Sequence, residues 1–317
     1  MTSLNNASAA AADAIAEEGL IGDPVPLWKQ TWKRLLRKRS GQVGLIIIGL
    51  LLLIAITAPV IAPYDPNDVL IGTEHVKRRE APCVHLLGCD INRPQHIMGI
   101  DGNSRDTFSR VLYGTRVSLM IGLVTVTTAL VSGVLLGAIA GFFGGIADNI
   151  IMRIMDVILG FPSLLLAIAI VAVLGPGIVN ALLAISIVSM PAYARVTRAS
   201  VLSVKTLDFV SATRALGGSP ARILFRRVLP NALTPIVVLA TLGIATAILD
   251  AAGLSFLGLG AQPPMPEWGT MLGTEKDQVF SAPHLVFFPG IAIMLTVLGF
   301  NLLGDGLRDA LDPRLNT

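Results

Sequence analysis

Two cysteines, Cys83 and Cys89, are the residues of this 317-residue chain best suited to covalent chemistry. They lie six positions apart in a polar segment and are the only cysteines in the sequence. Such a pair can form a disulfide where the segment faces an oxidising compartment. His85 and His96 lie nearby, but a structural zinc site needs four well-placed ligands, and two thiols alone do not make one. The sequence leaves a disulfide and two free thiols as open alternatives.

Catalytic motifs are absent from the sequence. It contains neither a Gly-x-x-x-x-Gly-Lys-Ser/Thr phosphate loop nor a His-Glu-x-x-His metal motif, so we expect no ATP, metal or cofactor site on this chain. Residues 253–257, Gly-Leu-Ser-Phe-Leu, resemble a serine-nucleophile turn but lack its second glycine. The four histidines leave little for acid–base catalysis. We therefore expect a protein that is not an enzyme.

Ionisable residues deep in membrane spans would indicate an ion-coupled secondary transporter. The candidates are Arg153, Asp156 and Asp250, and all three lie near the ends of predicted spans. Apart from Arg195, the last residue of the fourth predicted span, the remaining span residues are uncharged, which disfavours ion coupling and places the energy source outside this chain.

The composition indicates a membrane protein. Hydrophobic residues make up 53% of the chain and charged residues only 14%, against about 25% charged in soluble domains, and the mean hydropathy is +0.71. A bilayer core of about 30 Å needs about 20 apolar residues of helix. The sequence thus predicts an all-α membrane protein with six transmembrane helices, at residues 43–61, 117–143, 149–174, 178–195, 232–249 and 285–303.

The N-terminal region divides into a tail and a basic arm. Residues 1–27 are rich in Ala, Asp and Glu and lack the pattern of a signal peptide, so we expect a disordered tail. In the arm, residues 28–42, Trp28, Trp32, Leu35 and Leu36 fall near one helical face among six basic residues. Two interpretations remain open: an amphipathic helix on an anionic inner leaflet, or a plain positive-inside anchor.

Loop charges predict the orientation. The N-terminal arm, the loops 144–153 and 194–227 and the C-terminal tail hold 16 Lys and Arg residues, against 8 in the opposite set of loops. Basic loops stay in the cytoplasm, so both termini are expected inside and residues 62–116 form an extracytoplasmic loop. The net charge is only +3, so bulk charge says little about partners; we expect none that is a nucleic acid.

The longest cytoplasmic connection, residues 196–230, predicts two short helices around a turn. The first covers 207–216 and ends at Gly217-Gly218, where glycine allows a left-handed cap. Ser219 suits an N-cap and Pro220 the first helical position. The second helix should run to Leu229, with Pro230 closing it before the fifth span. On composition alone this segment is an ordinary basic inside loop.

The same loop resembles the EAA loop of ABC-importer permeases, a Glu-Ala-Ala stretch followed by a glycine and a hydrophobic segment ending in Leu-Pro. The matching residues are Ser211-Ala212-Thr213, Gly217 and Leu229-Pro230. Further segments resemble the second, C-type permease of the dipeptide, oligopeptide and nickel systems: residues 32–45, 62–66, 96–119, 247–272 and 300–315.

This resemblance implies a type I ABC-importer permease in the cytoplasmic membrane that moves peptides, with nickel or another small solute as the alternative. It implies a homologous sister permease, two ATPase subunits that carry ATP and Mg, and an extracytoplasmic binding protein. It also implies a coupling helix near 208–217 that contacts the ATPases. The residues it assigns to coupling are Asp208, Phe209, Ser211, Ala212, Thr213, Arg214, Ala215, Gly217, Pro220, Leu229 and Pro230. It names no residue of the substrate path.

Overall fold

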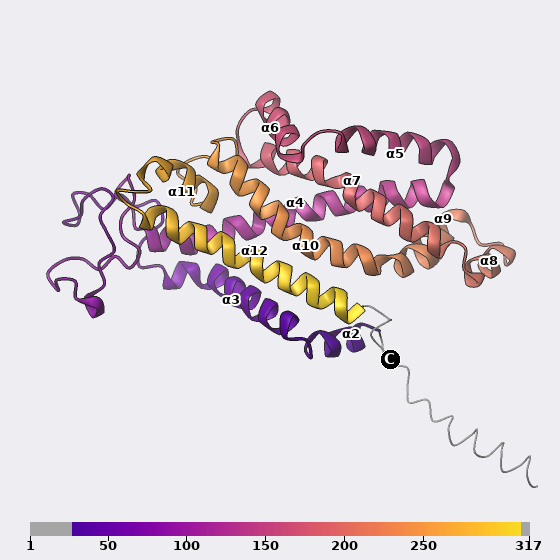
Figure 1. Cartoon of the computed structure of the whole chain (residues 1–317), viewed down its shortest axis with the longest axis horizontal. Coiled ribbons are helices and arrows are strands. Elements are labelled where there is room, and N and C mark those ends of the chain that lie inside the picture. Colours follow the sequence, from indigo (N-terminus) through magenta and orange to yellow (C-terminus); the bar gives the residue numbers. More distant parts are fainter. Residues whose placement is uncertain (1–26, 312–317) are drawn as a thin grey trace, which may run out of the picture.

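The computed structural model describes residues 27–311, and every regular element in that range is helical (Figure 1). The predicted tail therefore lies outside the described residues, except that Leu27 begins the first helix, α2 (Leu27–Leu35). Five helical stretches are long and apolar enough to cross a membrane: α3 (Arg39–Ile61), α4 (Thr107–Phe143), α7 (Ile178–Val204), the stretch Pro220–Phe256 that ends in α10 (Leu229–Phe256), and α12 (His284–Leu311).

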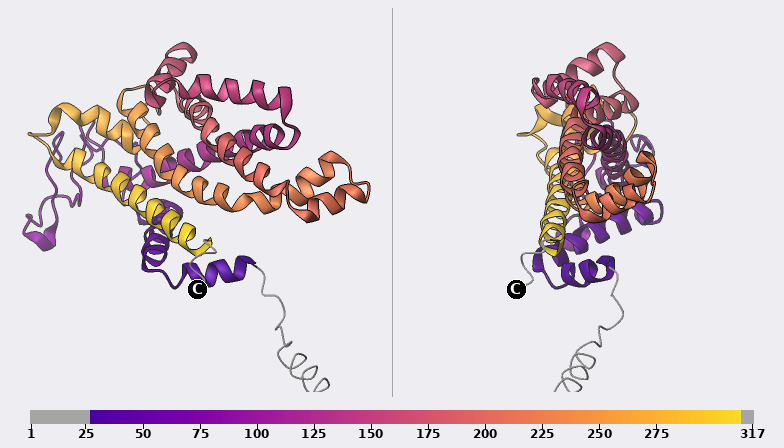
Figure 2. Two further views of the ribbon diagram at one scale, coloured as in Figure 1. Left: turned by 45° about the vertical axis from the view of Figure 1, so that its right-hand side comes forward. Right: turned by 90° about the vertical axis from the view of Figure 1, so that its right-hand side faces the viewer.

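The long helices run between two ends of the molecule. The loop that follows α3 and the short helix α11 (Trp268–Glu275) lie at one end, and the short helix α8 (Asp208–Ala215) lies at the other (Figure 1). Viewed along the bundle, α5 (Gly145–Leu159) and α6 (Ser163–Leu174) lie on one side, and α2 and α3 on the opposite side (Figure 2). The bundle thus separates the outer loop from the loop that carries α8.

The predicted third span, residues 149–174, is not a single straight helix. The segment forms α5 and α6, which are bent by 93° at the break between them. Pro162 stands directly before α6, and a proline both removes a helical N–H donor and disfavours the helical conformation of the residue before it. Apolar length alone therefore could not distinguish a straight span from a broken pair.

The other span boundaries extend beyond the predicted ones. α3 begins at Arg39 rather than 43, and α4 begins at Thr107 rather than 117. α7 continues to Val204, well past the predicted end at 195. Hydropathy marks only the segment that lies in hydrocarbon, whereas helical hydrogen bonding continues into the polar layer. The outer loop consequently covers 62–106 rather than 62–116.

Close packing of α4 against α7 uses glycines spaced four residues apart. A Cβ atom on Gly133 would lie 2.7 Å from the Met190 carbonyl oxygen, and one on Gly141 would lie 2.9 Å from that of Arg198. At Gly137 the same atom would overlap the Ala194 carbonyl oxygen. Small residues at this spacing let helix backbones approach closely in membranes, and these glycines therefore mark a direct contact between α4 and α7.

We predict that Gly137→Val will destabilise the folded protein by about 1–3 kcal/mol, the usual range for overpacking a closely packed core. The valine side chain would have to displace the α7 backbone at Ala194. Gly49→Val is the matched control, because a Cβ on Gly49 meets no atom within 4 Å. Thermal unfolding in detergent, followed by size-exclusion chromatography, measures both. Equal midpoints for the two variants would contradict the packing role of Gly137.

Candidate functional site

Helix α8 ends in a Schellman motif. The Gly218 N–H donates to the Thr213 carbonyl oxygen at 3.1 Å, and the Gly217 N–H donates to that of Arg214 at 3.0 Å. These are the two bonds that define the motif, and they require a left-handed residue between them. Gly217 supplies it with φ = +79°. The predicted glycine cap is therefore confirmed.

A single buried side chain attaches α8 to the bundle. Val210 is fully buried, whereas the other residues of the helix are exposed or half-buried. It packs in an apolar cluster drawn from α4, α7 and the start of the fifth span, whose other members are Ala138, Val201, Ile223, Leu224, Val228 and Ala232. Val210 thus places α8 in contact with residues of three long helices. The sequence reasoning did not single out Val210, although it is the one β-branched aliphatic residue in the helix.

The other side of α8 is open. Of the α8 residues assigned to coupling, Thr213 is half-buried. The others are exposed: Asp208, Phe209, Ser211, Ala212, Arg214 and Ala215. Within the described part of the chain Arg214 makes no ion pair. The three small residues Ser211, Ala212 and Ala215 leave the helix narrow on this side. α8 therefore presents a small surface with a free cation that a partner protein can contact.

The segment after α8 starts as predicted and then departs from the prediction. Ser219 Oγ accepts a hydrogen bond from the Arg222 N–H at 3.4 Å, and Pro220 occupies the first turn of α9 (Pro220–Ile223). Pro230 does not end this helix, because the chain continues helically through η2 (Leu224–Val228) into α10. η2 is a π-helical turn, and its wider spacing accommodates a proline one turn later without a break. Leu229 packs on the Val210 cluster and Pro230 is exposed.

Ion pairs join α5 to the end of α7 nearest α8. Arg198 binds Asp148 through two hydrogen bonds of 2.5 and 2.6 Å. Arg195 binds Asp156 at 2.6 Å, so Asp156, a candidate for ion coupling in the sequence, has an arginine partner at the surface. These pairs link the broken third span to the helix that leads into α8.

In the outer loop a disulfide joins Cys83 and Cys89, whose Cα atoms lie 5.4 Å apart. Cys83 also pairs with His96 through backbone hydrogen bonds of 2.9 and 3.0 Å. His96 in turn binds Asp106 through Nδ1 at 2.9 Å and Glu74 through Nε2 at 3.2 Å. Asp106 caps α4 by accepting the Ser109 N–H at 2.7 Å. The disulfide-closed loop is thereby connected to the first turn of the second span.

The surroundings of two side chains in this loop, His96 and Tyr64, raise their pKa values. Burial alone would lower the pKa of His96, but the hydrogen bond to Asp106 and the charges of Asp106 and Glu74 outweigh it and raise the pKa. Burial and the hydrogen bond to Glu74 raise the pKa of Tyr64 to about 12. Tyr64 therefore stays neutral, and protonated His96 is favoured between its two carboxylate partners.

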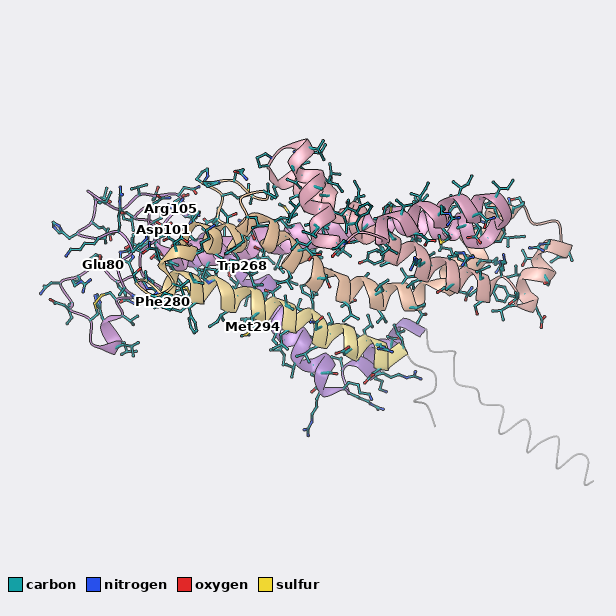
Figure 3. All side chains as sticks on the ribbon, turned by 45° about the horizontal axis from the view of Figure 1, so that its top comes forward. Glu80, Asp101, Arg105, Trp268, Phe280 and Met294 are labelled. Carbon is teal, nitrogen blue, oxygen red and sulfur yellow. A yellow bond between two sulfur atoms is a disulfide. The ribbon has the colours of Figure 1, made fainter. Side chains whose placement is uncertain are left out.

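The outer loop is also tied to α11. Glu275 accepts from Arg79 Nε at 2.8 Å and from the Gly102 N–H at 2.9 Å. Trp268, at the start of α11, is completely buried and donates from Nε1 to the Val111 carbonyl oxygen of α4 at 3.1 Å. Asp101 and Arg105, which pair with each other at 2.8 Å, lie beyond Trp268 toward the end of the bundle (Figure 3). These contacts make the outer end a folded cap on the helices.

Five apolar helical stretches and a bent helix pair define the chain as a helical protein of the multi-spanning membrane class. The family model for the inner membrane component of binding-protein-dependent transport systems matches residues 133–317. The model for the N-terminal transmembrane domain of oligopeptide transport permease C matches residues 26–82. The chain therefore belongs to the inner membrane permease family of binding-protein-dependent transport systems, and it is a multi-pass membrane protein.

Curated relatives cover nearly the whole chain. The dipeptide transport system permease protein DppC of Alkalihalophilus pseudofirmus is 48% identical over 92% of this chain and 91% of its own. The di/tripeptide permease DppC of Pseudomonas aeruginosa is 46% identical over 92% and 93%. The glutathione permease GsiD of Pectobacterium atrosepticum is 44% identical over 92% of each chain.

A solved structure supports the fold. A chain of the inward-facing MetNI methionine ABC transporter aligns with a TM-score of 0.53 at 20% identity, covering 64% of this chain and 96% of that one. The predicted all-α, type I ABC-importer permease fold is confirmed at the level of the fold.

We predict that Val210→Asp will release α8 from the bundle, because an unpaired carboxylate is strongly disfavoured in an apolar cluster. Amide hydrogen exchange across residues 208–218 should become at least about tenfold faster, equivalent to about 1.4 kcal/mol. Ser211→Asp places the same charge on the exposed side of α8 and should leave exchange unchanged. Slow exchange in the Val210 variant would show that other contacts hold the helix.

Proposed function

We propose that this chain is the permease subunit of an ATP-driven importer of di- or oligopeptides. The observation that carries the substrate class is the 48% identity over 92% of the chain with a dipeptide permease, joined by relatives named for di/tripeptides and glutathione, itself a peptide. Nickel, the alternative that the sequence left open, has no support from these relatives.

The proposed assembly has four kinds of component. A homologous sister permease pairs with this chain, and two ATPase subunits dock beneath them in the cytoplasm and carry the ATP and Mg. An extracytoplasmic binding protein delivers the peptide to the end of the bundle that carries the outer loop. Both termini of this chain then lie in the cytoplasm, in keeping with the excess of Lys and Arg in the N-terminal arm and in the loop that carries α8.

Helix α8 is the coupling element in this proposal. The ATPase dimer closes on ATP and moves α8, and Val210 passes that movement to α4, α7 and the fifth span. The permease pair alternates between inward-facing and outward-facing states as a rigid-body change, and ATP hydrolysis resets it. The transfer of this movement depends on the orientation of α8, and the turn at Gly217 sets that orientation.

We predict that Gly217→Val will uncouple ATP hydrolysis from uptake. A β-branched residue at φ = +79° is strained by about 1–2 kcal/mol, so the end of α8 should change conformation. No atom lies within 4 Å of the added Cβ position, so the bundle itself should be unaffected. In proteoliposomes holding the complete importer, dipeptide uptake should fall at least about tenfold while ATP hydrolysis persists.

Gly217→Asn is the control, because asparagine tolerates the left-handed conformation, and it should retain most of the uptake. Normal uptake by the valine variant at a normal membrane level would refute the coupling role of this turn. Uphill uptake in vesicles that lack the ATPase subunits would refute the ATP-driven importer itself.

We predict that Arg214→Glu will weaken co-purification of the ATPase subunits with this chain by at least about fivefold. Reversing an exposed charge in an interface introduces repulsion where attraction oriented the docking. Arg222→Glu, on α9, is the comparison for a general loss of positive charge in the loop. Unchanged recovery of the ATPases with the Arg214 variant would count against a docking role for this residue.

A further inference from the structure

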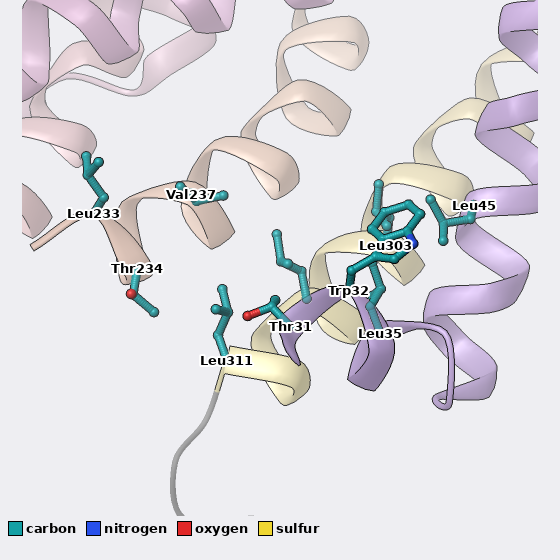
Figure 4. Close-up of a pocket in the computed structure, with 10 residues that line it drawn as sticks. Thr31, Trp32, Leu35, Leu45, Leu233, Thr234, Val237, Leu303 and Leu311 are labelled. Carbon is teal, nitrogen blue, oxygen red and sulfur yellow. The ribbon is translucent and has the colours of Figure 1, made fainter. Parts of the chain in front are cut away.

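An apolar groove of about 600 Å³ lies between α2, α3, α10 and α12 (Figure 4). The side chains of Trp32 and Leu35 from α2 face Leu45 of α3 and Leu303 of α12, with Leu233 and Val237 of α10 across the gap. Trp32 is 51% exposed although it is a large aromatic residue on the groove. The volume falls in the range of about 300–1,000 Å³ that is usual for small-molecule sites.

Close packing fixes α2 beside this groove. Leu35 is 3% exposed and sits over two glycines, Gly41 of α3 and Gly306 of α12. A Cβ on Gly41 would lie 2.6 Å from a Leu35 methyl carbon, and one on Gly306 would lie 3.2 Å from it. The turn between α2 and α3 is closed by Gln42, whose side-chain N–H donates to the Leu36 carbonyl oxygen at 2.8 Å. The groove is therefore preformed.

The groove lies near one end of the helix bundle. Its lining comes from the first turns of α3 and α10 and the last turns of α12, which is the end of the bundle that carries α8. Under the orientation proposed above, this is the cytoplasmic leaflet. The apolar lining of the groove suits acyl chains, which fill the hydrocarbon layer, better than it suits water.

The chain beside the groove is strongly basic. Residues 27–39 contain six basic residues and no acidic one: Lys29, Lys33, Arg34, Arg37, Lys38 and Arg39. Lys38 forms an ion pair with Asp309 of α12 at 3.7 Å. Arg34 lies between the two groove-lining residues Trp32 and Leu35 in sequence and is half-buried. Basic side chains at a membrane surface attract anionic lipid headgroups.

The chemistry and shape of the groove disfavour a peptide or a partner helix as its occupant. It contains no charged side chain, and its polar members are the hydroxyl residues Thr31 and Thr234. A zwitterionic peptide would leave its charges unpaired there. A transmembrane helix of a partner protein is about 10 Å across and would need an open groove. Here α2 partly covers the groove beside α12 (Figure 4). A flexible hydrocarbon chain with an anionic head satisfies both the lining and the adjacent charge.

We propose that the groove is a binding site for an anionic phospholipid, with one acyl chain between α2 and α10 and the phosphate against the basic side chains of α2. The bound lipid would fill the space between the N-terminal helix and the start of the fifth span, and so would hold both in register.

Retention of defined lipids by the purified importer complex tests this site. The complex is exchanged into micelles that contain palmitoyl-oleoyl phosphatidylglycerol and phosphatidylcholine in equal amounts, and the retained lipid is counted by native mass spectrometry. We expect the wild type to retain phosphatidylglycerol at least about fivefold over phosphatidylcholine. Val237→Trp, which fills the groove, should reduce retained phosphatidylglycerol at least about fivefold. Ile46→Trp is the matched control on the exposed face of α3 and should match the wild type.

A second variant separates the headgroup from the chain. Lys33→Gln with Arg34→Gln should abolish the preference for phosphatidylglycerol while phosphatidylcholine is still retained. If the complex that carries Val237→Trp does not assemble, the Lys33→Gln and Arg34→Gln double variant tests the proposal by itself. Equal retention of the two lipids by the wild type, or an unchanged preference in the double variant, would overturn the proposal. So would efficient cross-linking of a cysteine at Leu233 to the sister permease, because that result would place a protein in the groove. The experiment measures bound lipid rather than transport. Its result can therefore be interpreted even if the proposed peptide import is disproved.

Discussion

The close approach of α4 and α7 is the contact on which the rest of this structure depends. Three glycines of α4 lie directly against α7 carbonyl oxygens and leave no room for a side chain. In a bilayer, apolar side chains gain little by leaving lipid for protein, so close packing of this kind is a main source of helix association. The contact places Ala138 of α4 and Val201 of α7 on either side of one apolar cluster. Without it, there would be no fixed site for Val210 of α8.

The attachment of α8 combines rigidity along the chain with a small area of contact. The Schellman turn at Gly217 and the serine cap at Ser219 hold the two halves of the loop in a defined geometry. Only Val210 of α8 enters the bundle, so the rest of the helix is left for a partner. In the proposed coupling role, this contact would carry a displacement of α8 to the neighbouring helices, because packed cores deform little.

Different interactions stabilise the two ends of the bundle. At the α8 end, apolar packing dominates, with the Arg198–Asp148 pair at its margin. At the outer end, where water is present, a network of charges connects the loop to the helices through His96, Asp106, Arg79 and Glu275. Each of these charges has a partner, which removes most of the cost of partial burial. Trp268 of α11 then closes the outer end over α4.

The sequence by itself determined the class of protein, the positions of the apolar helices and the glycine, serine and proline signals of the cytoplasmic loop. These follow from local chemistry: hydropathy over about 20 residues, and the backbone preferences of Gly217, Ser219 and Pro220. Only the tertiary structure decided that residues 149–174 form a bent pair, that the helix continues through Pro230, and that Val210 holds α8. Those outcomes depend on neighbours that are distant in the sequence. Whether a proline breaks a helix or is accommodated by a π-helical turn, and which of several apolar residues is buried, is settled by the packing energy of the surrounding helices rather than by the residue itself.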